Sequence, residues 1–99
     1  MRIVFTTHGW EDYTHWLVAD RMVRKRINRL IDDSLRDPLA GIGKPEQLRH
    51  VLPGAWSRRI DGEQRLVYLV QDRDMVVCRL ATTTRGDGGF HVGGQRGAP

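Results

Sequence analysis

The side chains best suited to chemistry lie in one short stretch and in the strand that follows it. Glu46 stands in a loop rich in glycine and proline, close in sequence to Lys44 and Arg49. A carboxylate beside cations can accept a proton from a hydroxyl group such as a ribose 2′-hydroxyl. Arg65 begins a predicted strand, where a fixed guanidinium can hold a phosphate through two hydrogen bonds. The pattern therefore indicates a surface suited to gripping RNA and moving a proton.

Each of these residues also has a plain structural interpretation, and the sequence leaves both open. Glu46 could be an ordinary solvated loop carboxylate, because most charged side chains are simply exposed. Arg65 could pair instead with Glu63 or Asp61, which lie just before it. His50 could shuttle a proton or stack on a base, or it could hold the loop in place.

Other basic residues are equally ambiguous. Arg58 and Arg59 are neighbours in a predicted strand, so their side chains point to opposite faces. At most one of them can therefore share a face with Arg65. A second basic group lies along a predicted helix and consists of Arg24, Lys25 and Arg29. This group could contact a phosphate backbone, although a solvated helix face is the usual role of such a run.

The composition fits one small basic domain. The chain has 99 residues, a formal net charge of +4 and a sequence pI near 10.0, which favours polyanions or acidic proteins as partners. Its single cysteine, Cys78, lies in an apolar run and is predicted to be a buried strand residue rather than a reactive thiol. The histidines are scattered, so no metal or cofactor site is predicted. With no membrane span or signal sequence in view, we expect a soluble, cytoplasmic protein.

The elements that must position these residues begin with a strand and two helices. Residues 1–6 are rich in β-branched and aromatic side chains and predict a strand. Apolar residues at helical spacing predict a helix that opens at Thr7 or His8. Asp20 can cap a second helix that runs to about Asp37. The two helices are expected to form an antiparallel hairpin.

The second half of the chain predicts three strands joined by tight turns. They are expected at residues 55–60, 65–71 and 75–80. The order β-α-α-β-β-β then predicts an α+β fold, with an antiparallel sheet and the helical hairpin on one face. Alternation in the middle strand directs Leu66 and Tyr68 to the core. Arg65 should lie on the opposite face, which stays partly open.

The end of the chain has a different composition. Residues 84–99 hold six of the eleven glycines and few large apolar side chains. Such a segment cannot bury enough apolar surface to offset the entropy lost on ordering it. We therefore expect a folded domain over residues 1–80 and a flexible tail over residues 81–99, ordered only through contact with something else.

Four motifs carry a family resemblance: Trp10-Glu11-Asp12-Tyr13, Gly43-Lys44-Pro45-Glu46-Gln47-Leu48, Trp56-Ser57-Arg58-Arg59-Ile60 and Arg65-Leu66-Val67-Tyr68. With the spacing between them, they make residues 1–79 similar to the YoeB (Txe) toxins of bacterial YefM–YoeB toxin–antitoxin modules, in the RelE/ParE superfamily. The resemblance implies a RelE/YoeB-like fold.

The same resemblance implies a toxin that is a metal-independent, ribosome-dependent endoribonuclease (an mRNA interferase). It would cut mRNA in the ribosomal A site and inhibit translation. Glu46 would be the general base, and Arg65 would bind the phosphate and its transition state. We expect further RNA contacts from Lys44, Arg49, His50 and Arg59. The expected partners are a YefM-type antitoxin, the ribosome with its A-site mRNA and a second copy of the chain; no membrane and no cofactor are expected.

The end of the last predicted strand departs from the family pattern. The family closes this strand with Arg-Tyr-His-Tyr, and the resemblance implies that the histidine is the general acid. Here Arg79 is followed by Leu80, Ala81 and Thr82. The loss of one such acid typically lowers a rate by about 10²–10⁴-fold. Two interpretations stay open: a weakened nuclease, or a catalytically dead module that binds antitoxin or ribosome and acts in autoregulation.

Overall fold

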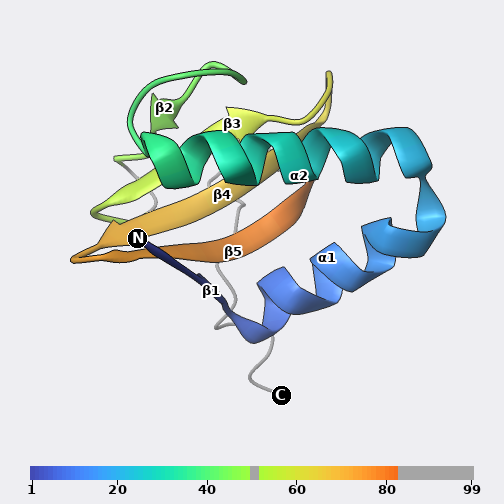
Figure 1. Cartoon of the computed structure of the whole chain (residues 1–99), viewed down its shortest axis with the longest axis horizontal. Helices are drawn as coiled ribbons and strands as arrows, with labels where there is room; N and C mark the ends of the chain where they lie inside the picture. The colour runs from blue at the N-terminus through green and yellow to red at the C-terminus, as the bar shows by residue number, and fades with distance from the viewer. Residues whose placement is uncertain (50–51, 83–99) are drawn as a thin grey trace.

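The computed structural model describes residues 1–49 and 52–82 and has an α+β architecture (Figure 1). Its elements are β1 (Arg2–Phe5), α1 (Thr7–Ala19), α2 (Arg21–Arg36), β2 (Glu46–Gln47), β3 (Ala55–Arg59), β4 (Gln64–Gln71) and β5 (Asp74–Thr82). The predicted class is confirmed, and so is the predicted order of elements, to which the structure adds the two-residue strand β2. Strand β5 continues to Thr82, past the domain boundary expected at residue 80. The tail expected over the last residues falls, from residue 83 on, outside the described part of the chain.

The sheet is mixed, whereas the sequence predicted an antiparallel one. Its strand order is β1-β5-β4-β3-β2, and β2 to β5 pair antiparallel as expected. Strand β1 pairs with β5 in parallel, with Ile3 opposite Met75. The partners in this pair lie about 70 residues apart in sequence, as the 72-residue separation of Arg2 and Asp74 shows. Local turn patterns therefore hold no information about their relative direction.

The two helices begin at side-chain caps that the sequence displays. The Thr6 hydroxyl accepts a hydrogen bond from the Gly9 amide, and the Asp20 carboxylate accepts from the amides of Met22 and Val23. Asp20 thus confirms the predicted cap. Helix α2 lies across one face of the sheet (Figure 1). Within residues 1–49 and 52–82, neither helix is both long and apolar enough to cross a membrane.

The core fills the space between α2 and the sheet. Its buried members are Ile27, Leu30, Ile31, Ile60, Leu66, Tyr68, Met75, Val77 and Leu80. The helix residues among them recur at the three- and four-residue spacing of one helix face. Leu66 and Tyr68 belong to this core, as predicted. The sheet face away from α2 is called the outer face below.

Helix α1 follows β1 (Figure 1). It packs against the edge of β5 beyond the residues that pair with β1. Gly9 lets the helix approach closely, because a Cβ at this position would collide with the Val77 carbonyl. The Asp12 carboxylate accepts a hydrogen bond from the Leu80 amide at 2.9 Å. The Trp16 indole donates to the Leu80 carbonyl at 2.6 Å. Helix side chains therefore satisfy backbone groups that a neighbouring strand would otherwise bind.

The burial of Cys78 in β5 can be tested by the reactivity of its thiol, without any assay of function. Its side chain is 1% exposed, and burial raises the pKa of its thiol to about 11. The prediction of a buried strand cysteine is confirmed. Because the thiolate is the reactive form, iodoacetamide at pH 8 should alkylate the native chain at least about 100-fold more slowly than the urea-unfolded chain. Intact mass spectrometry over time measures both rates; equal rates would contradict the buried position.

Candidate functional site

Strands β2, β3 and β4 bring Glu46 and Arg65 together on the outer face. Glu46 Oε1 lies 3.6 Å from Arg65 Nη1. The same nitrogen donates a hydrogen bond to Ser57 Oγ at 3.2 Å. The Glu46 side chain is 65% exposed and the Arg65 side chain 26% exposed. The carboxylate is thus open to a ligand, while the guanidinium is partly held in place.

The alternative pairing of Arg65 within its own turn does not occur in this structure. Asp61 Oδ1 instead accepts hydrogen bonds from the amides of Glu63 and Gln64, at 2.8 and 2.7 Å. This carboxylate therefore fixes the turn between β3 and β4. Arg65 is left to reach across the sheet toward Glu46.

The register places Arg65 in the middle of a row that crosses three strands. Arg59 in β3 is its partner on one side, and Ala81 in β5 is its partner on the other. Like charges placed directly opposite each other are unfavourable in a sheet, and an anion between them would relieve the repulsion. The row therefore favours an anionic ligand. Ala81, however, brings no titratable group to it.

Two of the remaining predicted RNA contacts flank β2. Lys44 and Arg49 are both exposed, and Arg49 Nε donates to Gln47 Oε1 at 3.4 Å. Lys44 has a φ of 52°, a left-handed conformation that non-glycine residues rarely adopt. Neither cation forms an ion pair with Glu46 across the described ranges 1–49 and 52–82. His50 lies outside those ranges.

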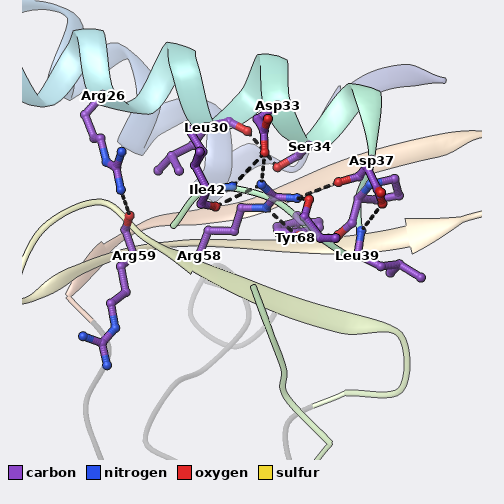
Figure 2. Close-up of polar contacts among 12 residues, drawn as sticks. Arg26, Leu30, Asp33, Ser34, Asp37, Leu39, Ile42, Arg58, Arg59 and Tyr68 are labelled. Carbon is purple, nitrogen blue, oxygen red and sulfur yellow. Dashed lines mark hydrogen bonds and ion pairs between the residues drawn. The ribbon is translucent and has the colours of Figure 1, made fainter. Parts of the chain in front are cut away.

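Arg58 has a role that the sequence did not reveal. Its side chain points away from the outer face, opposite to Arg59 (Figure 2), and it is fully buried. Its guanidinium donates to five oxygens: Asp33 Oδ2 at 2.7 Å, the Tyr68 hydroxyl at 3.1 Å, and the carbonyls of Asp37, Ala40 and Ile42 at 2.7, 2.9 and 3.0 Å. Arg58 thus fixes the segment 37–42, which leads toward Glu46.

The groups around Arg58 have shifted pKa values that suit this role. The Ile42 amide and the Arg58 guanidinium hold the pKa of Asp33 below its ordinary range. Burial raises the pKa of Tyr68, whose hydroxyl donates to the Pro38 carbonyl at 2.6 Å. An ionised carboxylate and a neutral phenol therefore surround the buried cation. The only signal in the sequence was strand alternation, which puts Arg58 and Arg59 on opposite faces. The register of the folded sheet then pairs Arg58 with the core residue Leu66.

Two basic residues of α2, Arg24 and Arg26, have structural contacts. Arg24 Nη1 donates to the Leu17 carbonyl at 3.1 Å, which ties the two helices together. Arg26 donates to the carbonyls of Arg59 and Ile60, both at 3.3 Å, and so ties α2 to the end of β3 (Figure 2). Lys25 and Arg29, the other two cations of this predicted group, are exposed. The structural interpretation is therefore favoured for Arg24.

Potential metal ligands do not gather in the described part of the chain. Across residues 1–49 and 52–82, no three His, Cys, Asp or Glu side chains are grouped so that they could hold a metal ion. The arrangement on the outer face instead offers one carboxylate and two guanidinium groups. It can accept a proton and bind an oxyanion.

Comparison with known sequences places these residues in a family context. Residues 5–82 match the profile of the YoeB-like toxins of bacterial type II toxin–antitoxin systems. Toxin YoeB of Streptomyces coelicolor is 61% identical over 77 residues, which cover 78% of this chain and 92% of the relative. Toxin YoeB of Escherichia coli K12 is 46% identical over 81 residues, covering 80% and 96%.

Solved structures agree with the sequence matches. A YoeB/ParE toxin from Agrobacterium tumefaciens superposes with a TM-score of 0.81 at 38% identity, covering 85% of this chain and all of that one. The YoeB dimer from Staphylococcus aureus gives a TM-score of 0.78 at 38% identity. A YoeB–YefM complex from the same organism gives 0.77 at 36% identity. Both of these cover 85% of this chain and 98% of the toxin chain.

Proposed function

The chain belongs to the YoeB-like toxins of bacterial type II toxin–antitoxin systems, and from this premise we propose that it is a ribosome-dependent endoribonuclease that cleaves mRNA and inhibits translation. The observation that carries the proposal is the meeting of Glu46 with Arg65 on the outer face, 3.6 Å apart and next to Arg59. The proposed base, Glu46, and the proposed oxyanion ligand, Arg65, are then close enough to act on the same phosphodiester.

The proposed reaction is an internal transfer at phosphorus. The Glu46 carboxylate removes the proton from a ribose 2′-hydroxyl, and the 2′-oxygen forms a bond to the adjacent phosphorus. The bond from phosphorus to the 5′-oxygen breaks, giving a 2′,3′-cyclic phosphate and a 5′-hydroxyl. Arg65 and Arg59 stabilise the charge that develops on the phosphate oxygens. The exposure of Glu46, at 65%, supports access of the RNA.

The leaving 5′-oxygen needs a proton, but the cross-strand partner of Arg65 on β5 has no side-chain group that can donate one. Ala81 occupies that position, so we propose that water supplies the proton. Catalysis without a positioned acid is slower by about 10²–10⁴-fold. The chain should therefore cleave RNA more slowly than relatives that retain a histidine in this row.

We propose a YefM-type antitoxin, the ribosome and a second copy of this chain as its partners. A solved relative is a YoeB–YefM complex and another is a YoeB dimer, and these assemblies support the first and third of the partners. The net charge of +4 supports binding to the polyanionic RNA of the ribosome.

The test is expression of the chain without antitoxin, followed by mapping of mRNA 5′ ends in translating cells. Glu46→Ala and Arg65→Ala should each reduce the new 5′ ends at least about 100-fold, because each removes a group that acts on the reacting phosphodiester. A matched control is Glu63→Ala, an exposed carboxylate in the turn between β3 and β4, which should leave the cuts unchanged. Normal growth and uncut mRNA with the wild-type chain would contradict the proposal.

A second candidate function is a non-enzymatic module that binds antitoxin or ribosome in autoregulation. The alanine beside Arg65 favours it, because the row lacks a proton donor. Both candidate functions predict antitoxin binding, and they differ only in whether the chain cleaves mRNA. Stable antitoxin binding together with uncut mRNA would therefore select this candidate.

A further inference from the structure

Arg65 is held by a hydroxyl group that lies diagonally across the sheet from it. Its direct partner in β3 is Arg59, but its side chain reaches Ser57, two residues away along the same strand. Ser57 is fully buried and is the cross-strand partner of Glu46. Because two guanidinium groups repel each other, a hydroxyl that accepts from Arg65 draws it away from Arg59 and toward Glu46.

This contact also determines which edge of the guanidinium is engaged. Both Ser57 and Glu46 contact Nη1 of Arg65, at 3.2 and 3.6 Å. Its Nε and Nη2 form no hydrogen bond with the described residues. Nε and Nη2 together form one of the two edges through which arginine binds a phosphate with parallel hydrogen bonds. That edge is therefore kept for a ligand.

We propose that Ser57 is a positioning residue for this site: its hydroxyl fixes the Arg65 guanidinium so that the Nε–Nη2 edge faces the scissile phosphate. The proposal rests on the proposed function. The ion pair with Glu46 is too long and too exposed to fix the guanidinium alone, at 3.6 Å with a 65% exposed carboxylate. The buried hydroxyl supplies the directional constraint, and Glu46 remains available as the base.

The functional test compares three full-length variants on ribosomes programmed with mRNA, under single-turnover conditions. Ser57→Ala removes the acceptor, and Ser57→Cys keeps a side chain of similar size whose sulfur accepts only weakly. The matched control is Ser34→Ala, because Ser34 is also fully buried but donates to the Leu30 carbonyl within α2. We expect both Ser57 variants to cleave about 10- to 100-fold more slowly, with half-saturating ribosome concentration within about twofold of wild type. Ser34→Ala should cleave at the wild-type rate.

A second measurement, which does not depend on RNA cleavage, reports on the Arg65 side chain directly. In the free protein, NMR of the arginine side chains should show slowly exchanging Nη1 protons for Arg65, assigned by their absence in Arg65→Lys. These signals should persist in Ser34→Ala and disappear in Ser57→Ala. Wild-type signals that survive in Ser57→Ala would overturn the proposal whatever the cleavage assay gives.

The two assays separate this inference from the function on which it rests. If the wild-type chain cuts mRNA and Ser57→Ala cuts equally fast, the positioning role is wrong and the nuclease stands. If Ser57→Cys is as fast as wild type while Ser57→Ala is slow, Ser57 acts through packing and the proposal is again wrong. If the wild-type chain does not cut, the nuclease is wrong, and the NMR signals alone decide whether Ser57 holds Arg65.

Discussion

Ala81→His is expected to raise the single-turnover rate of mRNA cleavage by about 10²–10⁴-fold. The register makes residue 81 the direct β5 partner of Arg65, so an imidazole there joins the row that we propose to hold the phosphate. It can then protonate the leaving 5′-oxygen, a step that we propose water performs in the wild-type chain. Because the acid must be protonated, the gain should be full below a pKa of about 6.5 and fall as the pH rises above it.

The matched control for this gain is a histidine placed elsewhere on the sheet. Gln71 lies exposed at the other end of β4 from Arg65, so Gln71→His should leave the rate unchanged. The double variant Ala81→His with Arg65→Ala should lose the gain, since the acid needs a bound phosphate. A rate for Ala81→His equal to that of wild type, with the fold intact, would show that residue 81 does not reach the reacting phosphodiester.

Arg58→Ala is expected to lower the free energy of unfolding by about 3–5 kcal/mol. The substitution removes the donor for five oxygens in and around the core and leaves a cavity where the side chain was fully buried. A domain of this size has a total stability of only about 5–15 kcal/mol. The loss is therefore a large fraction of the total stability of the fold. Urea titration followed by tryptophan fluorescence measures the difference.

The neighbouring residue supplies the control for Arg58. Arg59→Ala removes the same type of side chain from the next position of β3, where it is exposed. A surface substitution of this kind changes stability by about 0.5 kcal/mol or less. Arg58→Ala and Arg59→Ala titrations that coincide would mean that the buried network contributes little to stability.

Much of the fold follows from local patterns. The two helices, the Asp20 cap and the meander β3–β5 were all predictable, because alternation, capping chemistry and turn residues act over a few neighbouring positions. The parallel pairing of β1 with β5 was not, since it joins segments about 70 residues apart. The network of Arg58 was missed for the same reason: its oxygens come from α2, the following loop and β4.

The sequence by itself determined the family, the types of groups available for chemistry and the face on which Arg65 lies. These depend on residue identity, spacing and the alternation of side chains along a strand. Only the tertiary structure decided that Arg59 stands beside Arg65 while Arg58 is buried, that Ser57 accepts a hydrogen bond from the Arg65 guanidinium, and that Ala81 is the β5 partner of Arg65. The physical reason is register: a strand position acquires its neighbours only when separate strands pair, and no local property of the chain fixes that pairing.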